Sequence, residues 1–149
     1  MSINIKSILA GAVLGAVVYH IAAFFVLGHT AAIALPESIA TWATENSARF
    51  PVIFMWDFLV VQLLGVGILS AISTYVILRA ASFDWLCLAI GFLTADIILS
   101  LASILTLPKL EYVSVDNFIG WLPHFIVVFL CVFIAARLGR KKRIIACQS

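Results

Sequence analysis

Residues 85–107 read WLCLAIGFLTADIILSLASILTL, an apolar run whose one carboxylic acid, Asp96, lies close to its middle. An α-helix of about 20 residues crosses the hydrocarbon layer of a bilayer, so this run is long enough to span one. A charged side chain at mid-membrane costs roughly 2.5–3.5 kcal/mol on insertion scales. Asp96 therefore requires a polar partner from another segment, or a function.

The composition of the whole chain also indicates a membrane protein. Its 149 residues are 64% hydrophobic and 11% charged, with a mean hydropathy of +1.20. Soluble domains average about 45–50% apolar and 25% charged residues, so this chain has too little polar surface for a water-facing globule. We expect one all-α domain, an integral membrane four-helix transmembrane bundle, with spans at 8–27, 51–78, 85–107 and 118–138.

Local sequence signals mark the ends of the predicted spans. Gly28 follows the first run as a plausible helix terminator. The brief link before Trp85 predicts a tight hairpin, with Ser82 or Asp84 capping the third helix. The connections are therefore expected to be outer loops at 28–50 and 108–117, followed by a basic cytoplasmic tail at 139–149.

The first outer loop contains a possible helix of its own. Pro36 is suited to a helix start, and Ile39, Trp42 and Ala43 would then lie on one side. Such an amphipathic piece would lie at the membrane interface. It would serve either as a lid over the bundle or as a loop held against the surface.

The distribution of basic residues predicts the orientation. Seven fall on one side of the predicted spans, and only Arg49 and Lys109 on the other. The positive-inside rule then places both termini in the cytoplasm, and the pattern fits a bacterial inner membrane. The C-terminal cluster is also a candidate for contact with anionic lipid or a partner. Its members are Arg140, Lys141, Lys142 and Arg143.

Small residues in the first span indicate close helix packing. Gly11 and Gly15 form a G-x-x-x-G pattern, which allows two helices to approach closely. His20 follows Ala12 and Ala16 at helical spacing, so we expect its imidazole in this seam.

One histidine or aspartate lies inside each predicted span. Counting at 1.5 Å per residue places all of them in the outer half of the bundle. Ser100 and Ser103 extend a polar stripe outward from the acid of the third span. Burial of the corresponding faces would bring two imidazoles and two carboxyls toward one axis. The predicted proton, ion or substrate site therefore comprises His20, Asp57, Asp96, His124, Ser100 and Ser103.

Several chemistries suit this set of side chains. Buried carboxyls and imidazoles in contact can share a proton near neutral pH, or simply hydrogen-bond and fix helix register. The same four side chains, His20, Asp57, Asp96 and His124, are candidate ligands for a divalent metal, and the two histidines for haem b. No E-x-x-H or H-x-x-x-H pair occurs, so the sequence favours no cofactor.

Three functions remain open. The first is a proton- or cation-linked transporter or channel, which we expect to be a homo-oligomer in the lipid bilayer. The second is a non-catalytic subunit or assembly factor of a larger membrane complex. The third is a haem- or metal-binding redox protein. The chain has no serine–histidine–aspartate spacing, phosphate-binding glycine loop or nucleic-acid motif, so neither a soluble-type enzyme nor a nucleic-acid partner is expected.

Overall fold

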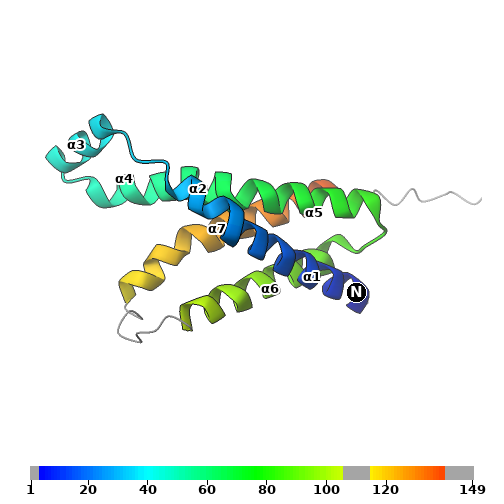
Figure 1. The fold of residues 1–149 in the computed structure, drawn as a ribbon. Coiled ribbons are helices and arrows are strands. Elements are labelled where there is room, and N and C mark those ends of the chain that lie inside the picture. The colour runs from blue at the N-terminus through cyan, green and yellow to red at the C-terminus, as the bar shows by residue number, and fades with distance from the viewer. Residues whose placement is uncertain (1–3, 106–114, 140–149) are drawn as a thin grey trace, which may run out of the picture.

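The computed structural model describes residues 4–105 and 115–139, and every regular element in these ranges is a helix (Figure 1). Four of the helical segments there are long and apolar enough to cross a membrane, which confirms the prediction of four candidate spans. They are Ile5–Thr30, Arg49–Ala80, Trp85–Ser103 and Trp121–Gly139.

Two of these spans change their helical geometry along their length. The first and second contain π-helical stretches, in which each backbone N–H bonds five residues back instead of four. In chain order the elements are α1 (Ile5–Ile21), η1 (Ala22–Val26), α2 (Leu27–Ala31), α3 (Glu37–Glu45), α4 (Arg49–Trp56), η2 (Asp57–Gly67), α5 (Ile68–Ala80), α6 (Trp85–Leu105) and α7 (Val115–Gly139).

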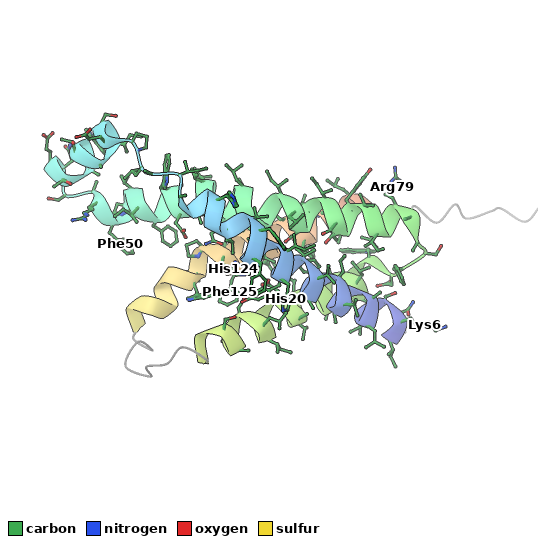
Figure 2. The ribbon with its side chains drawn as sticks, in the orientation of Figure 1. Lys6, His20, Phe50, Arg79, His124 and Phe125 are labelled. Carbon is green, nitrogen blue, oxygen red and sulfur yellow. The ribbon has the colours of Figure 1, made fainter. Side chains whose placement is uncertain are left out.

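Helix ends from distant parts of the chain meet at one end of the bundle. The Ser7 hydroxyl accepts a hydrogen bond of 2.9 Å from the backbone N–H of Asp84, which joins the start of α1 to the start of α6. Gly139 at the end of α7 lies against Leu78 near the end of α5. The spans therefore alternate in direction, and Lys6 and Arg79 lie at this same end (Figure 2).

Glycine allows α1 and α6 to pack with their backbones in contact. A Cβ atom at Gly11 would overlap the backbone carbonyl of Leu88, and one at Gly91 would overlap that of Ile8. Gly15 is similarly close to the backbone of Phe92. The G-x-x-x-G pattern thus faces another helix of the same chain.

The connections are partly as predicted. Asp84 caps α6 as expected, because its Oδ1 accepts a hydrogen bond of 2.9 Å from the Cys87 N–H. The prediction that Gly28 ends the first helix is wrong: no glycine has a positive φ in the described ranges, and the helix continues to Ala31. Most of the predicted loop 108–117 lies outside these ranges, as do residues 140–149 of the tail.

The short helix predicted after Pro36 is present as α3. It packs beside α4 at the end of the bundle opposite Lys6, and it does not lie across the spans as a lid (Figure 1). The Trp56 Nε1–H of α4 donates a hydrogen bond of 3.1 Å to the Ile33 carbonyl oxygen, which ties this connection to the second span.

Candidate functional site

The carboxyl of Asp96 and the imidazole of His124 form a pair inside the bundle. His124 Nε2 lies 3.3 Å from Asp96 Oδ2. Asp96 is 2% exposed and His124 is 3% exposed, so neither reaches solvent or lipid. α6 and α7 therefore meet through a buried acid–base pair.

The second span supplies further polar groups to this pair. Gln62 Oε1 lies 3.2 Å from His124 Nδ1. The Asp57 carboxyl lies close enough to interact electrostatically with the Gln62 amide and with His124. These residues connect three spans, and we call them the network: Asp96 and His124, which are buried, and Asp57 and Gln62, which are partly exposed.

The contact with Gln62 determines which nitrogen of the His124 imidazole carries a hydrogen. An amide oxygen only accepts, so Nδ1 of His124 carries a hydrogen and donates it to Gln62. The Gln62 amide N–H₂ can then donate to the Asp57 carboxyl. One further proton can lie on the Asp96 carboxyl, which gives a neutral acid beside a neutral imidazole, or on Nε2 of His124, which gives an ion pair. Both forms have the same net charge.

The π-helical stretch explains why Asp57 and Gln62 meet. In an α-helix two residues five apart point about 140° away from each other. A helix with bonds five residues apart turns less per residue, so positions i and i+5 lie on nearly the same face. η2 begins at Asp57 and includes Gln62. The predicted site starts from the histidines and aspartates inside the spans, so it does not include the Gln62 amide.

The predicted serines lie beside the network in different ways. Ser100 is fully buried, and its Oγ is 3.5 Å from His124 Nε2, at the outer limit for a hydrogen bond. Ser103 is one turn farther along α6 and bonds instead to the Tyr19 hydroxyl of α1 at 2.6 Å. Ser100 thus belongs to the surroundings of the pair, whereas Ser103 joins two helices.

The structure does not bring His20 to the network. Its side chain is exposed, its Nδ1 lies 2.8 Å from the carbonyl oxygen of Ala16, and its ring stacks on Phe24. The buried face of the first span includes Val18 and Ala22, each two residues away and so about 200° around the helix from His20. The expectation of His20 in the small-residue seam is therefore wrong.

This geometry bears on the cofactors considered above. Among the residues described, no group of three or more histidine, cysteine, aspartate or glutamate side chains is arranged to hold a metal ion. A haem held by two histidines would need both imidazoles at one buried space, but His20 is exposed and His124 is buried. The donor set therefore fits neither group.

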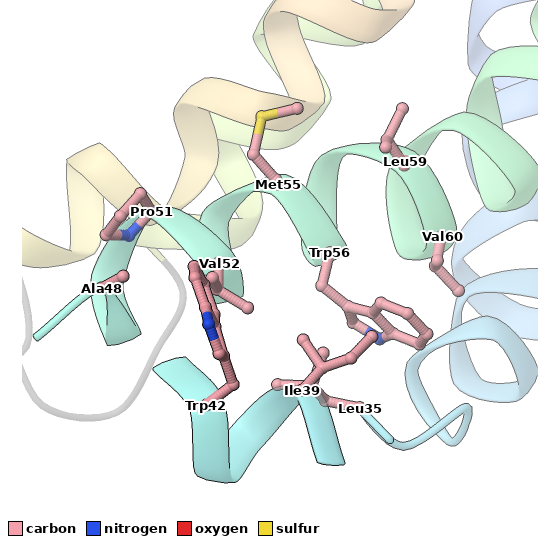
Figure 3. A pocket seen from close by; sticks show the side chains of 10 residues that line it. All are labelled: Leu35, Ile39, Trp42, Ala48, Pro51, Val52, Met55, Trp56, Leu59 and Val60. Carbon is pink, nitrogen blue, oxygen red and sulfur yellow. The ribbon is translucent and has the colours of Figure 1, made fainter. Parts of the chain in front are cut away.

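A separate groove of about 470 Å³ lies between α3 and α4 (Figure 3). It contains no titratable side chain, so it offers no acid–base chemistry. Trp42 of α3 faces α4 across it, and Trp56 lines its other end. The complete lining is Leu35, Ile39, Trp42, Ala48, Pro51, Val52, Met55, Trp56, Leu59 and Val60.

The basic cluster predicted to contact lipid or a partner, Arg140, Lys141, Lys142 and Arg143, lies outside the described residues. Comparisons with known proteins found no family model, no curated protein and no solved structure that matches the chain.

Proposed function

We propose that this chain is a small proton-linked membrane transporter in which Asp96 and His124 bind and release the proton. The observation that supports this most directly is the 3.3 Å contact between the two side chains inside the candidate spans. Carboxyl and imidazole groups are the side chains whose protonation enzymes and transporters most often use near neutral pH.

The proton balance of the pair is simple. In the resting state Asp96 and His124 hold one proton between them, besides the hydrogen on Nδ1. Uptake of a second proton gives a neutral carboxylic acid beside an imidazolium ion, with a net charge of +1. Release of that proton restores the neutral pair, so one cycle moves one proton and leaves the protein unchanged.

A purely structural role accounts less well for the acid. Interhelical polar contacts in membranes contribute about 0.6 kcal/mol on average, whereas a central carboxylate costs roughly 2.5–3.5 kcal/mol to insert. A few such contacts offset only part of this cost. We therefore favour a functional reason for placing Asp96 in the third span.

Four spans rarely enclose a transport pathway alone, so the proposal includes a homo-oligomer in the bilayer. Gly11 and Gly15 are already in contact with α6 of their own chain. A second copy would consequently bind through another face. A subunit of a larger membrane complex, the alternative function, would instead copurify with a different protein.

The test is proton flux into proteoliposomes that contain the purified protein and an internal pH-sensitive dye. We expect flux in the parent, and its loss in Asp96→Asn and in His124→Gln, since each variant removes one proton site. His20→Gln is the matched control, because His20 is an exposed histidine outside the network. Equal flux in all four proteins, or none in the parent, would contradict the proposal.

A further inference from the structure

Two hydroxyl groups in the second span are buried without a hydrogen-bond partner. Ser70 and Thr74 are both fully buried, and in the described part of the chain their oxygens are the buried side-chain atoms that lack a partner. Most serine and threonine side chains in helices bond back to a carbonyl one turn earlier. Ser73 in the same helix does so, with 2.8 Å between its Oγ and the Leu69 carbonyl oxygen.

These hydroxyls lie between the network and the end of the bundle where Arg79 lies. The stretch from Gln62 to Ser70 is partly π-helical, so burial rather than an α-helical count marks the side on which its residues lie. Val66, Ser70 and Thr74 follow one another in steps of four, and each is buried. They therefore follow the buried side of the second span from Gln62 toward the basic end.

One layer of apolar side chains separates the hydroxyls from the network. His124 and its two contacts, Gln62 and Asp96, each have an apolar residue four positions away toward the Arg79 end of the bundle. These residues are Val128 for His124, Val66 for Gln62 and Phe92 for Asp96. Val66, Phe92 and Val128 are each 1% exposed and belong to one core cluster, and we call them the apolar layer.

We propose that Ser70 and Thr74 line the path by which protons travel, through water admitted between the spans, from the Arg79 end to the Asp96–His124 pair. The apolar layer closes this path in the conformation described. Each hydroxyl accepts a proton from one water and donates its own to the next, so no net charge remains on it. This inference rests on the proposed function, because the path leads to the proton site.

Packing alone does not account for the two buried hydroxyls. A buried donor without a partner destabilises the folded protein, and replacing it by an apolar group of similar shape removes that penalty. A protein that needed only packing at these positions would be served better by alanine and valine. Buried polar groups that lack a protein partner are commonly bonded by water.

The first test removes the hydroxyls and measures proton flux in the same proteoliposomes. Ser70→Ala/Thr74→Val is expected to lower flux by about tenfold while the melting temperature is unchanged or higher. Thr74→Ser, which retains a hydroxyl, should keep the parental flux. Ser73→Ala is the matched control, since its hydroxyl is already bonded within its own helix.

The second test extends the polar path across the apolar layer. Val66→Thr replaces a methyl by a hydroxyl at nearly constant shape, midway between Ser70 and Gln62. We expect a several-fold increase in passive proton leak. Val76→Thr makes the same change on the same helix at a side chain that is 55% exposed, and it should leave the leak unchanged.

The outcomes separate the two proposals. Parental flux in Ser70→Ala/Thr74→Val, with flux lost in Asp96→Asn, would overturn the path and leave the transport function standing. An unchanged leak in Val66→Thr would also overturn the path, even if the double variant did not fold. Parental flux in Asp96→Asn would overturn the transport function itself.

Discussion

α6 contacts its neighbours by backbone packing on one side and by polar side chains on the other. On the side of α1, Gly11 and Gly91 bring the two backbones into contact, and the absence of side chains makes the interface possible. On the side of η2 and α7, Asp96 reaches His124, and specific polar atoms make the interface. One helix thus carries both a steric contact and a hydrogen-bonded one.

The difference separates what is fixed from what can rearrange. Close packing against backbone atoms has few alternatives, because any added atom overlaps its neighbour. Hydrogen bonds between side chains can change partners when a proton is gained or lost. We therefore expect α1 and α6 to move as one unit, and changes in protonation to alter the contact of that unit with η2 and α7.

The largest effect is expected from breaking the polar side of α6. His124→Leu leaves the Asp96 carboxyl buried without its partner, which typically costs about 3–5 kcal/mol of folding free energy. Asp96→Leu/His124→Leu removes both groups and should recover most of this loss. Unfolding in detergent measures both values, with His20→Leu as the exposed control. Additive losses in the double variant would show that the two side chains do not act as a pair.

A smaller effect is expected on the steric side. Gly11→Ala places a methyl group against the Leu88 carbonyl, and overpacking of this kind costs about 1–3 kcal/mol. Gly28→Ala is the control, because no heavy atom outside its own stretch of helix lies within 4 Å of the added methyl group. The same unfolding measurement should give a loss for the first variant and little change for the second. Equal stability of both would mean that the α1–α6 contact is looser than the structure indicates.

The smallest effect sharpens the comparison at a polar bond between α1 and the end of α6. Tyr19→Phe removes the 2.6 Å bond to Ser103 and should cost about 0.6 kcal/mol, the average for such contacts in membranes. Tyr75→Phe, a partly exposed tyrosine of α5, serves as control. A loss as large as that of His124→Leu would mean that the α1–α6 contact depends on polar atoms as strongly as the α6–α7 contact, which contradicts the comparison.

The sequence was sufficient to predict the spans and part of the site. Long apolar runs and their short connections predicted four helices, and the cost of a lone mid-membrane acid indicated that Asp96 needs a partner. The structure pairs it with His124, one of the residues in the predicted site. Local chemistry predicted Ser82 or Asp84 as the cap of α6, and Asp84 is the cap.

The rest of the site differs from the prediction for two separate reasons. The spacing of His20 to Ala16 predicts it in the seam, but contact with α6 selects the face of Gly11 and Gly15 instead. Gln62 is not ionisable, so a search for ionisable residues does not select it, and nothing in residues 57–67 indicates the π-helical bonding found there. The decision between α and π geometry is made by packing against neighbouring spans, which a single run of sequence does not record.

The tryptophans of α3 and α4 can report how deeply this end of the protein lies in a bilayer. The second span has 32 residues, and at about 1.5 Å each they would reach roughly 48 Å, well beyond a hydrocarbon layer of about 30 Å. Part of this excess belongs to α4, where Trp56 lines one end of the groove and Trp42 of α3 lies near the other (Figure 3). Quenchers attached at graded positions along the lipid tails would dim these indoles according to their distance from the bilayer centre. With Trp85 and Trp121 replaced by phenylalanine, the remaining fluorescence gives the immersion of this end of the bundle without a label on the protein.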